Sequence, residues 1–180
     1  AYFENGDFQT ALNHFDKARK IENPINDEET SQMIDVNIGL VTLLTGKFDL
    51  SYSFLKRALL YYEKTKDHEK TARVRHNLGM LHIEKKEYDK ALKEFEESIT
   101  ISEKNGLFPI LTISLLSKAF IYSEISDLRL SNYFAGKAFD LANSINDILT
   151  IADVYKVNGM NYRRKSEYEL SKIQFLNALR

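Results

Sequence analysis

Apolar residues recur along this chain at the three-to-four-residue spacing of helices that bury one face. One such stripe comprises Val74, Leu78 and Leu81. A second comprises Tyr88, Leu92, Phe95 and Ile99. Extended to the whole sequence, the pattern predicts an all-α chain with helices at 8–22, 28–45, 48–65, 68–85, 88–104, 108–125, 128–144, 148–165 and 168–180. Residues 1–4 are expected to be the end of a further helix.

Turn residues separate the predicted helices. Gly6 and Gly46 stand where a helix is expected to end in a left-handed residue, which glycine adopts at least cost. Aspartates that can accept the free N–H groups of the next helix recur at Asp27, Asp67 and Asp147. At one joint Leu107 replaces the aspartate, and there Gly106 is expected to end one helix while Pro109 begins the next.

The pattern repeats every forty residues. Small residues recur on the first helix of each unit at Gly39, Gly79, Ala119 and Gly159, and on the second helix at Ala11, Ser51, Ala91, Ser131 and Ser171. A second row of small residues comprises Ala18, Ala58, Ser98, Ala138 and Ala178. Large apolar residues recur at Phe8, Phe48, Tyr88, Leu128 and Tyr168. A fixed period of this length indicates stacked supersecondary units that share one continuous core.

The repeat predicts one solenoid, an α-α superhelix of about 4.5 helix-turn-helix repeats of forty residues. Its units lie near 1–26, 27–66, 67–106, 107–146 and 147–180. Because the chain begins and ends inside units, we expect it to be a fragment of a longer array.

The small and aromatic positions together resemble the tetratricopeptide repeat. The clearest stretch is Asn77-Leu78-Gly79 followed by 87–95, which reads Glu-Tyr-Asp-Lys-Ala-Leu-Lys-Glu-Phe. The period departs from the usual thirty-four residues, and the proline that usually closes each unit is missing. The longer unit is similar to those of kinesin light chains, Pins-type polarity adaptors and Rap/PlcR-type bacterial receptors.

This resemblance implies that the first helices line a concave groove. The candidate binding residues on these helices are Asn37, Leu40, Arg73, His76, Asn77, Met80, Ser117, Phe120, Lys156 and Met160. An asparagine amide can donate to and accept from a peptide backbone, so the row Asn37, Asn77 and Ser117 is a candidate peptide clamp. The alternative is that these amides bridge neighbouring helices. The row Leu40, Met80, Phe120 and Met160 offers adaptable apolar contacts, or else packs between helices.

Composition narrows the choice of function. The net charge is −1, which disfavours nucleic acid and gives no support to an anionic membrane as partner. There are no cysteines, and no bilayer-spanning run is visible. The histidines show no metal-ligand spacing, and no phosphate loop or nucleophile motif occurs. We therefore expect no enzyme, metal or cofactor.

The function that the sequence favours is a cytoplasmic interaction module that binds an extended protein or peptide segment in the concave groove. The alternative is a regulatory or structural array of a larger signalling protein. Such an array would engage its own chain or self-associate through uncapped ends.

Overall fold

The computed structural model describes residues 8–20 and 28–179, and each element in these ranges is a helix. The helices are α1 (Phe8–Lys20), α2 (Glu28–Leu44), α3 (Phe48–Thr65), α4 (His68–Glu84), α5 (Tyr88–Asn105), α6 (Phe108–Glu124), α7 (Leu128–Ser144), α8 (Ile148–Arg164) and α9 (Tyr168–Asn177). Every predicted start coincides with the observed one, and the largest difference is that α9 ends at Asn177 rather than at 180. The all-α solenoid is therefore confirmed. Residues 1–4, Gly6 and Asp27 lie outside the described ranges.

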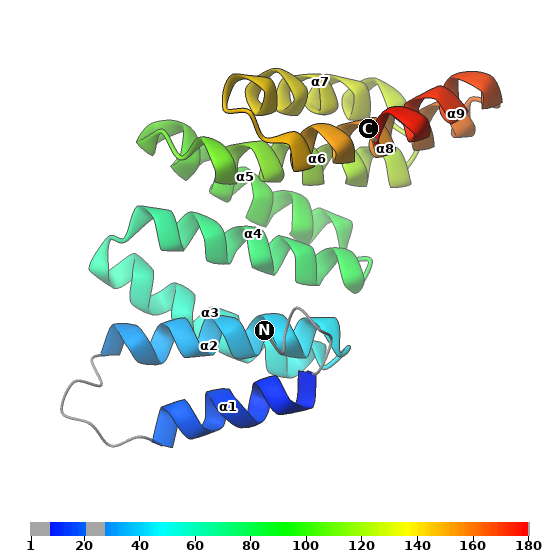
Figure 1. Ribbon diagram of the computed structural model, residues 1–180. Coiled ribbons are helices and arrows are strands. Elements are labelled where there is room, and N and C mark those ends of the chain that lie inside the picture. Colours follow the sequence, from blue (N-terminus) through cyan, green and yellow to red (C-terminus); the bar gives the residue numbers. More distant parts are fainter. Residues whose placement is uncertain (1–7, 21–27, 180) are drawn as a thin grey trace.

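The helices stack in sequence from α1 at one end to α9 at the other (Figure 1). Each helix packs on the next, and in addition α2 contacts α4, α4 contacts α6, and α6 contacts α8. Among the described helices, no such contact joins α3 to α5 or α5 to α7. The even-numbered first helices therefore form the inner, concave layer, and the second helices lie on the convex side.

Close helix approach explains the glycines of the first helices. A Cβ added at Gly79 would lie 2.5 Å from Cε1 of Phe95, and one added at Gly39 would lie 2.9 Å from Leu55. Gly159 stands in the same relation to Phe175, at 2.9 Å. In the fourth unit this glycine–large pair is replaced by two small residues, since Ala119 and Ala135 occupy the equivalent positions in one buried cluster.

The serines of the second helices are hydrogen-bonding residues as well as small ones. Ser51 Oγ donates to the carbonyl of Gly39 at 2.7 Å, and Ser171 Oγ donates to that of Gly159 at 2.8 Å. Ser131 does the same to Ala119 at 2.9 Å. Each bond ties the second helix of a unit to the first at the point of closest approach.

Recurrent backbone geometry closes the units. Asp67 accepts from the backbone N–H of Lys70 at 3.0 Å and Asp147 from that of Thr150 at 3.1 Å, which confirms both predicted caps. Left-handed residues follow the first helices at Gly46, Lys86, Ser126 and Ser166, and follow the second helices at Lys66, Gly106 and Asn146. The left-handed conformation thus recurs every forty residues, even at positions where the residue is not glycine.

One ion pair recurs with its charges exchanged. The guanidinium of Arg57 on α3 binds the fully buried carboxylate of Asp35 on α2 through two nitrogens, one of them at 2.6 Å. One unit later Arg75 occupies the position of Asp35, and Glu97 occupies that of Arg57. Arg75 Nη1 lies 2.5 Å from Glu97 Oε2, so the two units use one cross-helix geometry with opposite polarity.

Candidate functional site

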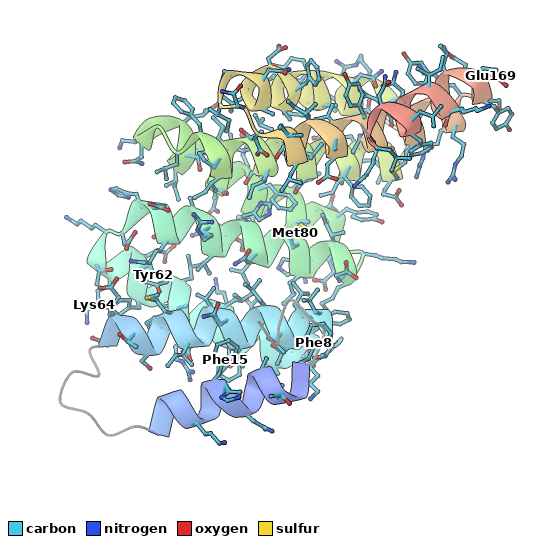
Figure 2. All side chains as sticks on the ribbon, in the orientation of Figure 1. Phe8, Phe15, Tyr62, Lys64, Met80 and Glu169 are labelled. Carbon is cyan, nitrogen blue, oxygen red and sulfur yellow. The ribbon has the colours of Figure 1, made fainter. Side chains whose placement is uncertain are left out.

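Three successive first helices, α4, α6 and α8, surround a hollow of about 330 Å³ on the concave layer. It is lined by Met80, Ile83, Glu84, Leu116, Ser117, Phe120, Asp153, Lys156, Val157 and Met160. We call it the C-terminal hollow. Figure 2 labels Met80 on α4, in the middle layer of the stack. The hollow brings together five of the ten candidate residues, Met80, Ser117, Phe120, Lys156 and Met160.

The floor of the C-terminal hollow is apolar, and its charges lie on exposed positions. Met80, Phe120 and Met160 are each half-buried, so each presents part of its side chain to solvent. Lys156 Nζ is 2.7 Å from Asp153 Oδ1 one turn away on α8. An apolar group that entered the hollow would therefore contact two flexible methionines and an aromatic ring without separating a buried charge.

A second hollow of about 310 Å³ lies nearer the N-terminus, and we call it the N-terminal hollow. It is lined by Met33, Val36, Asn37, Tyr62, Asp67, Glu69, Lys70, Arg73 and Val74. Lys70 Nζ binds Glu29 at 2.7 Å and Asp67 at 2.8 Å, and these carboxylates raise the pKa of its ammonium. Two candidate residues, Asn37 and Arg73, are therefore in this hollow.

The three residues of the candidate peptide clamp differ in their exposure and hydrogen bonding. Asn37 is exposed and Asn77 is half-buried. Neither amide makes a hydrogen bond to any side chain or backbone group in the described part of the chain. Ser117 differs, because its hydroxyl donates to the carbonyl of Ile113 at 2.9 Å and lies 3.8 Å from Met80 Sδ. The helix-bridging alternative thus finds no support at the two asparagines.

His76 is placed differently from the other candidate residues. Its Nδ1 lies 3.1 Å from Ser114 Oγ on α6, and its ring centroid is 5.4 Å from that of Phe95 on α5. Burial, and secondarily the charge of Arg73, lower the pKa of His76 to about 4. The side chain is therefore a neutral part of the α4–α5–α6 packing, and it lines neither hollow.

Arg73, which lines the N-terminal hollow, and Leu40 complete the set of candidate residues. Arg73 Nη2 binds Glu69 Oε1 at 3.0 Å on the same helix. Leu40 is half-buried on α2 and lines neither hollow.

Some residues that line the two hollows were not among the candidates predicted from the sequence. Tyr62 belongs to a second helix, yet its ring forms part of the N-terminal hollow while being 1% exposed. Ile83 was missed because it lies off the forty-residue rows chosen for the groove. Within residues 8–20 and 28–179, no group of three or more His, Asp or Glu side chains is placed to hold a metal ion. None of the helices in these ranges has both the length and the apolarity needed to cross a bilayer.

Comparisons with known proteins agree with this architecture. A tetratricopeptide repeat family model matches residues 29–104. The structure of BtubC (BKLC) from P. vanneervenii superposes with a TM-score of 0.78 at 16% identity, over 98% of this chain and 74% of that one. The apo form of RapI superposes with a TM-score of 0.79 at 16% identity, over 98% of this chain and 49% of RapI, so this chain spans about half of RapI. A comparison with curated protein sequences gives no match.

Proposed function

We propose that this chain, whose residues 29–104 match a tetratricopeptide repeat family model, is a protein-interaction module whose concave groove binds an extended segment of another polypeptide. The observation that carries this proposal is the C-terminal hollow, in which Met80, Phe120 and Met160 converge from three helices. Methionine side chains adapt to differently shaped apolar groups. The hollow would therefore receive an apolar side chain of the bound segment.

The asparagines supply the second element of recognition. A peptide unit offers one N–H and one carbonyl, and an asparagine amide can pair with both. The amides of Asn37 and Asn77 have no hydrogen-bond partner among the described residues, so binding breaks no internal bond at either. Ser117 already donates to a carbonyl of its own helix, and it contributes less. Backbone pairing would hold segments of different sequence.

Charge pairing in the groove argues against an acidic tail as the ligand. Arg73 pairs with Glu69, and Lys156 pairs with Asp153. Arg164 Nη2 binds Glu124 Oε1 at 2.8 Å between α8 and α6. A carboxylate-rich ligand would have to displace these partners. We therefore propose a segment that is recognised by its backbone and its apolar side chains, in a role that is binding rather than catalysis.

The test begins with peptides selected for binding from an array of uncharged, apolar-rich sequences and proceeds to titration calorimetry. For a micromolar ligand, binding amounts to about −8 kcal/mol. Each amide–backbone bond contributes about 0.5–1.5 kcal/mol, so Asn37→Ala with Asn77→Ala should weaken binding about tenfold or more for every peptide. Met80→Ala with Met160→Ala should weaken binding by amounts that depend on the peptide. The matched control is Asn105→Ala at the end of α5, outside both hollows, which should leave affinity unchanged.

Unchanged affinity together with a lowered melting temperature in the double asparagine variant would contradict the peptide clamp. That result would favour the alternative, an array that engages its own chain or a second copy. One observation is in keeping with it: Ile148 is 73% exposed, Leu149 81% and Leu179 83%, toward the C-terminal end of the described helices. Sedimentation of the purified chain over a concentration series would distinguish the two, because only self-association raises the mass with concentration.

A further inference from the structure

A cavity of about 400 Å³ lies in the joint between α7 and α8, away from the groove. It is lined by Asn132, Ala135, Gly136, Phe139, Val154, Tyr155, Asn158, Asn161, Tyr162 and Lys165. We call it the joint cavity. Its α8 residues occupy the face of that helix opposite to Val157 and Met160, which line the C-terminal hollow. The joint cavity is therefore separate from the groove.

The cavity exists because this joint departs from the repeat. Ala135 stands where the other units have Leu55, Phe95 and Phe175. Asn161 stands where the first helices of the other units have Val41, Leu81 and Ile121, and each of those three is buried. Two large apolar groups that fill the equivalent space elsewhere are thus replaced by a methyl group and an amide.

The preceding joint, between α5 and α6, shows what closes this space elsewhere. There Lys118 reaches across to the carboxylate of Glu96 and lies 4.4 Å from the ring centroid of Phe134. The equivalents of Lys118 and Glu96 in the α7–α8 joint are Asn158 and Gly136. Neither is long enough to bridge the two helices, so the space stays open.

No close contact requires a glycine at position 136. A Cβ added there would meet nothing within 4 Å, in contrast to Gly39, Gly79 and Gly159. Gly136 lies inside α7, where glycine destabilises a helix relative to alanine. Its effect is to leave one wall of the cavity without a side chain.

Asn161 is a buried amide with one unused hydrogen-bonding atom. It is 2% exposed, and its Nδ2 donates to Ser131 Oγ and to Asn132 Oδ1, both at 2.8 Å. The hydroxyl proton of Ser131 goes to the carbonyl of Ala119, so Ser131 can only accept, and this fixes which end of the amide faces it. Asn161 Oδ1 then has no partner among the described residues. The side-chain amide of Asn158 likewise makes no hydrogen bond in that part of the chain.

The remaining lining groups define a ligand. Lys165 is the one charged residue in the lining, and it forms no ion pair with any described residue. Phe139 and Tyr155 make an edge-to-face pair with centroids 5.8 Å apart, next to Val154 and Ala135. The amide oxygens would suit an ammonium or N–H group of a ligand. The lysine would suit a carboxylate, and the apolar wall would suit an apolar side chain. A volume of this size is typical of small-molecule sites.

We propose that the α7–α8 joint binds a small molecule of the α-amino-acid class with an apolar or aromatic side chain. Its carboxylate pairs with Lys165, its ammonium donates to the amide oxygens of Asn158 and Asn161, and its side chain packs on Phe139 and Val154. Entry of the ammonium to Asn161 Oδ1 needs a small outward movement of α8, because that atom is covered in the unliganded structure. The site shares no lining residue with the C-terminal hollow of the peptide groove.

The probes are the free protein amino acids at millimolar concentration, screened by thermal shift and followed by calorimetry. At least one apolar or aromatic amino acid should raise the melting temperature and give saturable heat. Its N-acetyl derivative, which lacks the ammonium, and its carboxamide, which lacks the carboxylate, should each bind at least about tenfold more weakly, a factor equivalent to 1.4 kcal/mol.

Two variants localise the binding. Gly136→Lys with Asn158→Leu restores the residues of the α3–α4 joint, Lys56 and Leu78, and should abolish binding while preserving the helical circular dichroism spectrum. Lys165→Gln should weaken binding at least about tenfold, whereas Lys85→Gln, at the equivalent place in the α3–α4 joint, should not change it. The Asn37→Ala, Asn77→Ala variant should keep full binding, which separates this site from the groove. No response to any amino acid, or a response that survives Gly136→Lys with Asn158→Leu, would overturn the proposal and leave the joint filled by water alone.

Discussion

Gly79 offers the sharpest test of how the two helices of a unit approach one another. An added Cβ would lie 2.5 Å from Cε1, 2.7 Å from Cζ and 2.8 Å from Cδ1 of Phe95. Phe95 is 0% exposed, so its ring has no solvent to move into. Gly79→Ala should therefore destabilise the protein by about 1–3 kcal/mol through overpacking. That is the reverse of the roughly 1 kcal/mol by which alanine is preferred over glycine inside a helix.

The fourth unit indicates how the strain can be relieved. There Ala119 and Ala135 occupy the positions of Gly79 and Phe95, and both are buried. Phe95→Ala alone should cost about 3–5 kcal/mol because it leaves a cavity. In that background Gly79→Ala removes a helical glycine without a clash, and should stabilise by about 0.5–1 kcal/mol. The two substitutions should therefore couple by about 1.5–4 kcal/mol in favour of the double variant.

The assay is urea unfolding of the wild type, both single variants and the double variant, followed by circular dichroism and fitted with a nearest-neighbour model suited to repeats. The matched control is Gly136→Ala. It makes the same change inside a helix where nothing lies within 4 Å, and it should stabilise by about 0.5–1 kcal/mol. If Gly79→Ala stabilises as much as Gly136→Ala, or if the two single effects add, the assignment of a close approach at Gly79 is wrong.

Three further predictions concern charge and capping. The pKa of His76 is about 4 in the folded chain and about 6.5 when unfolded, so the unfolded state binds more protons between these pH values. The free energy of unfolding should therefore fall by up to about 3 kcal/mol as the pH drops through this window. Urea titrations of the wild type and of His76→Leu should show a smaller fall in the variant. Arg57→Ala should cost about 1.5–3 kcal/mol by removing charged hydrogen bonds to Asp35, while Arg57→Glu with Asp35→Arg should recover part of the melting temperature lost in Arg57→Glu alone. Asp147→Ala should cost about 1 kcal/mol in thermal melts by removing the α8 cap, with exposed Asp140→Ala as the control that leaves the melt unchanged.

Helix positions could be predicted because the same packing problem is solved in every unit. The start of each described helix follows from the place of the large apolar residue or cap in the period, and all nine described starts coincide with prediction. The left-handed turn residues could not be found in this way. Lys86, Ser126 and Ser166 adopt positive φ without being glycine, because the short turn between antiparallel helices imposes that conformation and its hydrogen bonds. Local propensity is overridden there by the pairing of the helices.

The sequence predicted which helices line the candidate groove, but not the direction of every side chain on them, and the reason is geometric. Successive helical residues are rotated by about 100°, so a row chosen at forty-residue spacing fixes the face of a helix only coarsely. Met80, Phe120 and Met160 do converge on one hollow. His76, four residues before Met80, instead turns toward Ser114 and Phe95. The direction of such a side chain depends on its neighbours on two other helices. The periodicity of a single helix carries no information about those neighbours.

Helix α8 connects the two proposed sites mechanically. Val157 and Met160 form part of the C-terminal hollow, while Asn158 and Asn161 line the joint cavity on the opposite face. The α7–α8 joint lacks two large apolar residues of the earlier joints and the Lys118–Glu96 ion pair of the α5–α6 joint, so we expect a ligand of the joint cavity to act on the placement of α8. A molecule that binds one placement of α8 better than another shifts the population toward it, and with it the wall of the groove. Coupling of this kind is reciprocal: an amino acid that tightens peptide binding must itself be bound more tightly, by the same factor, when the peptide is present.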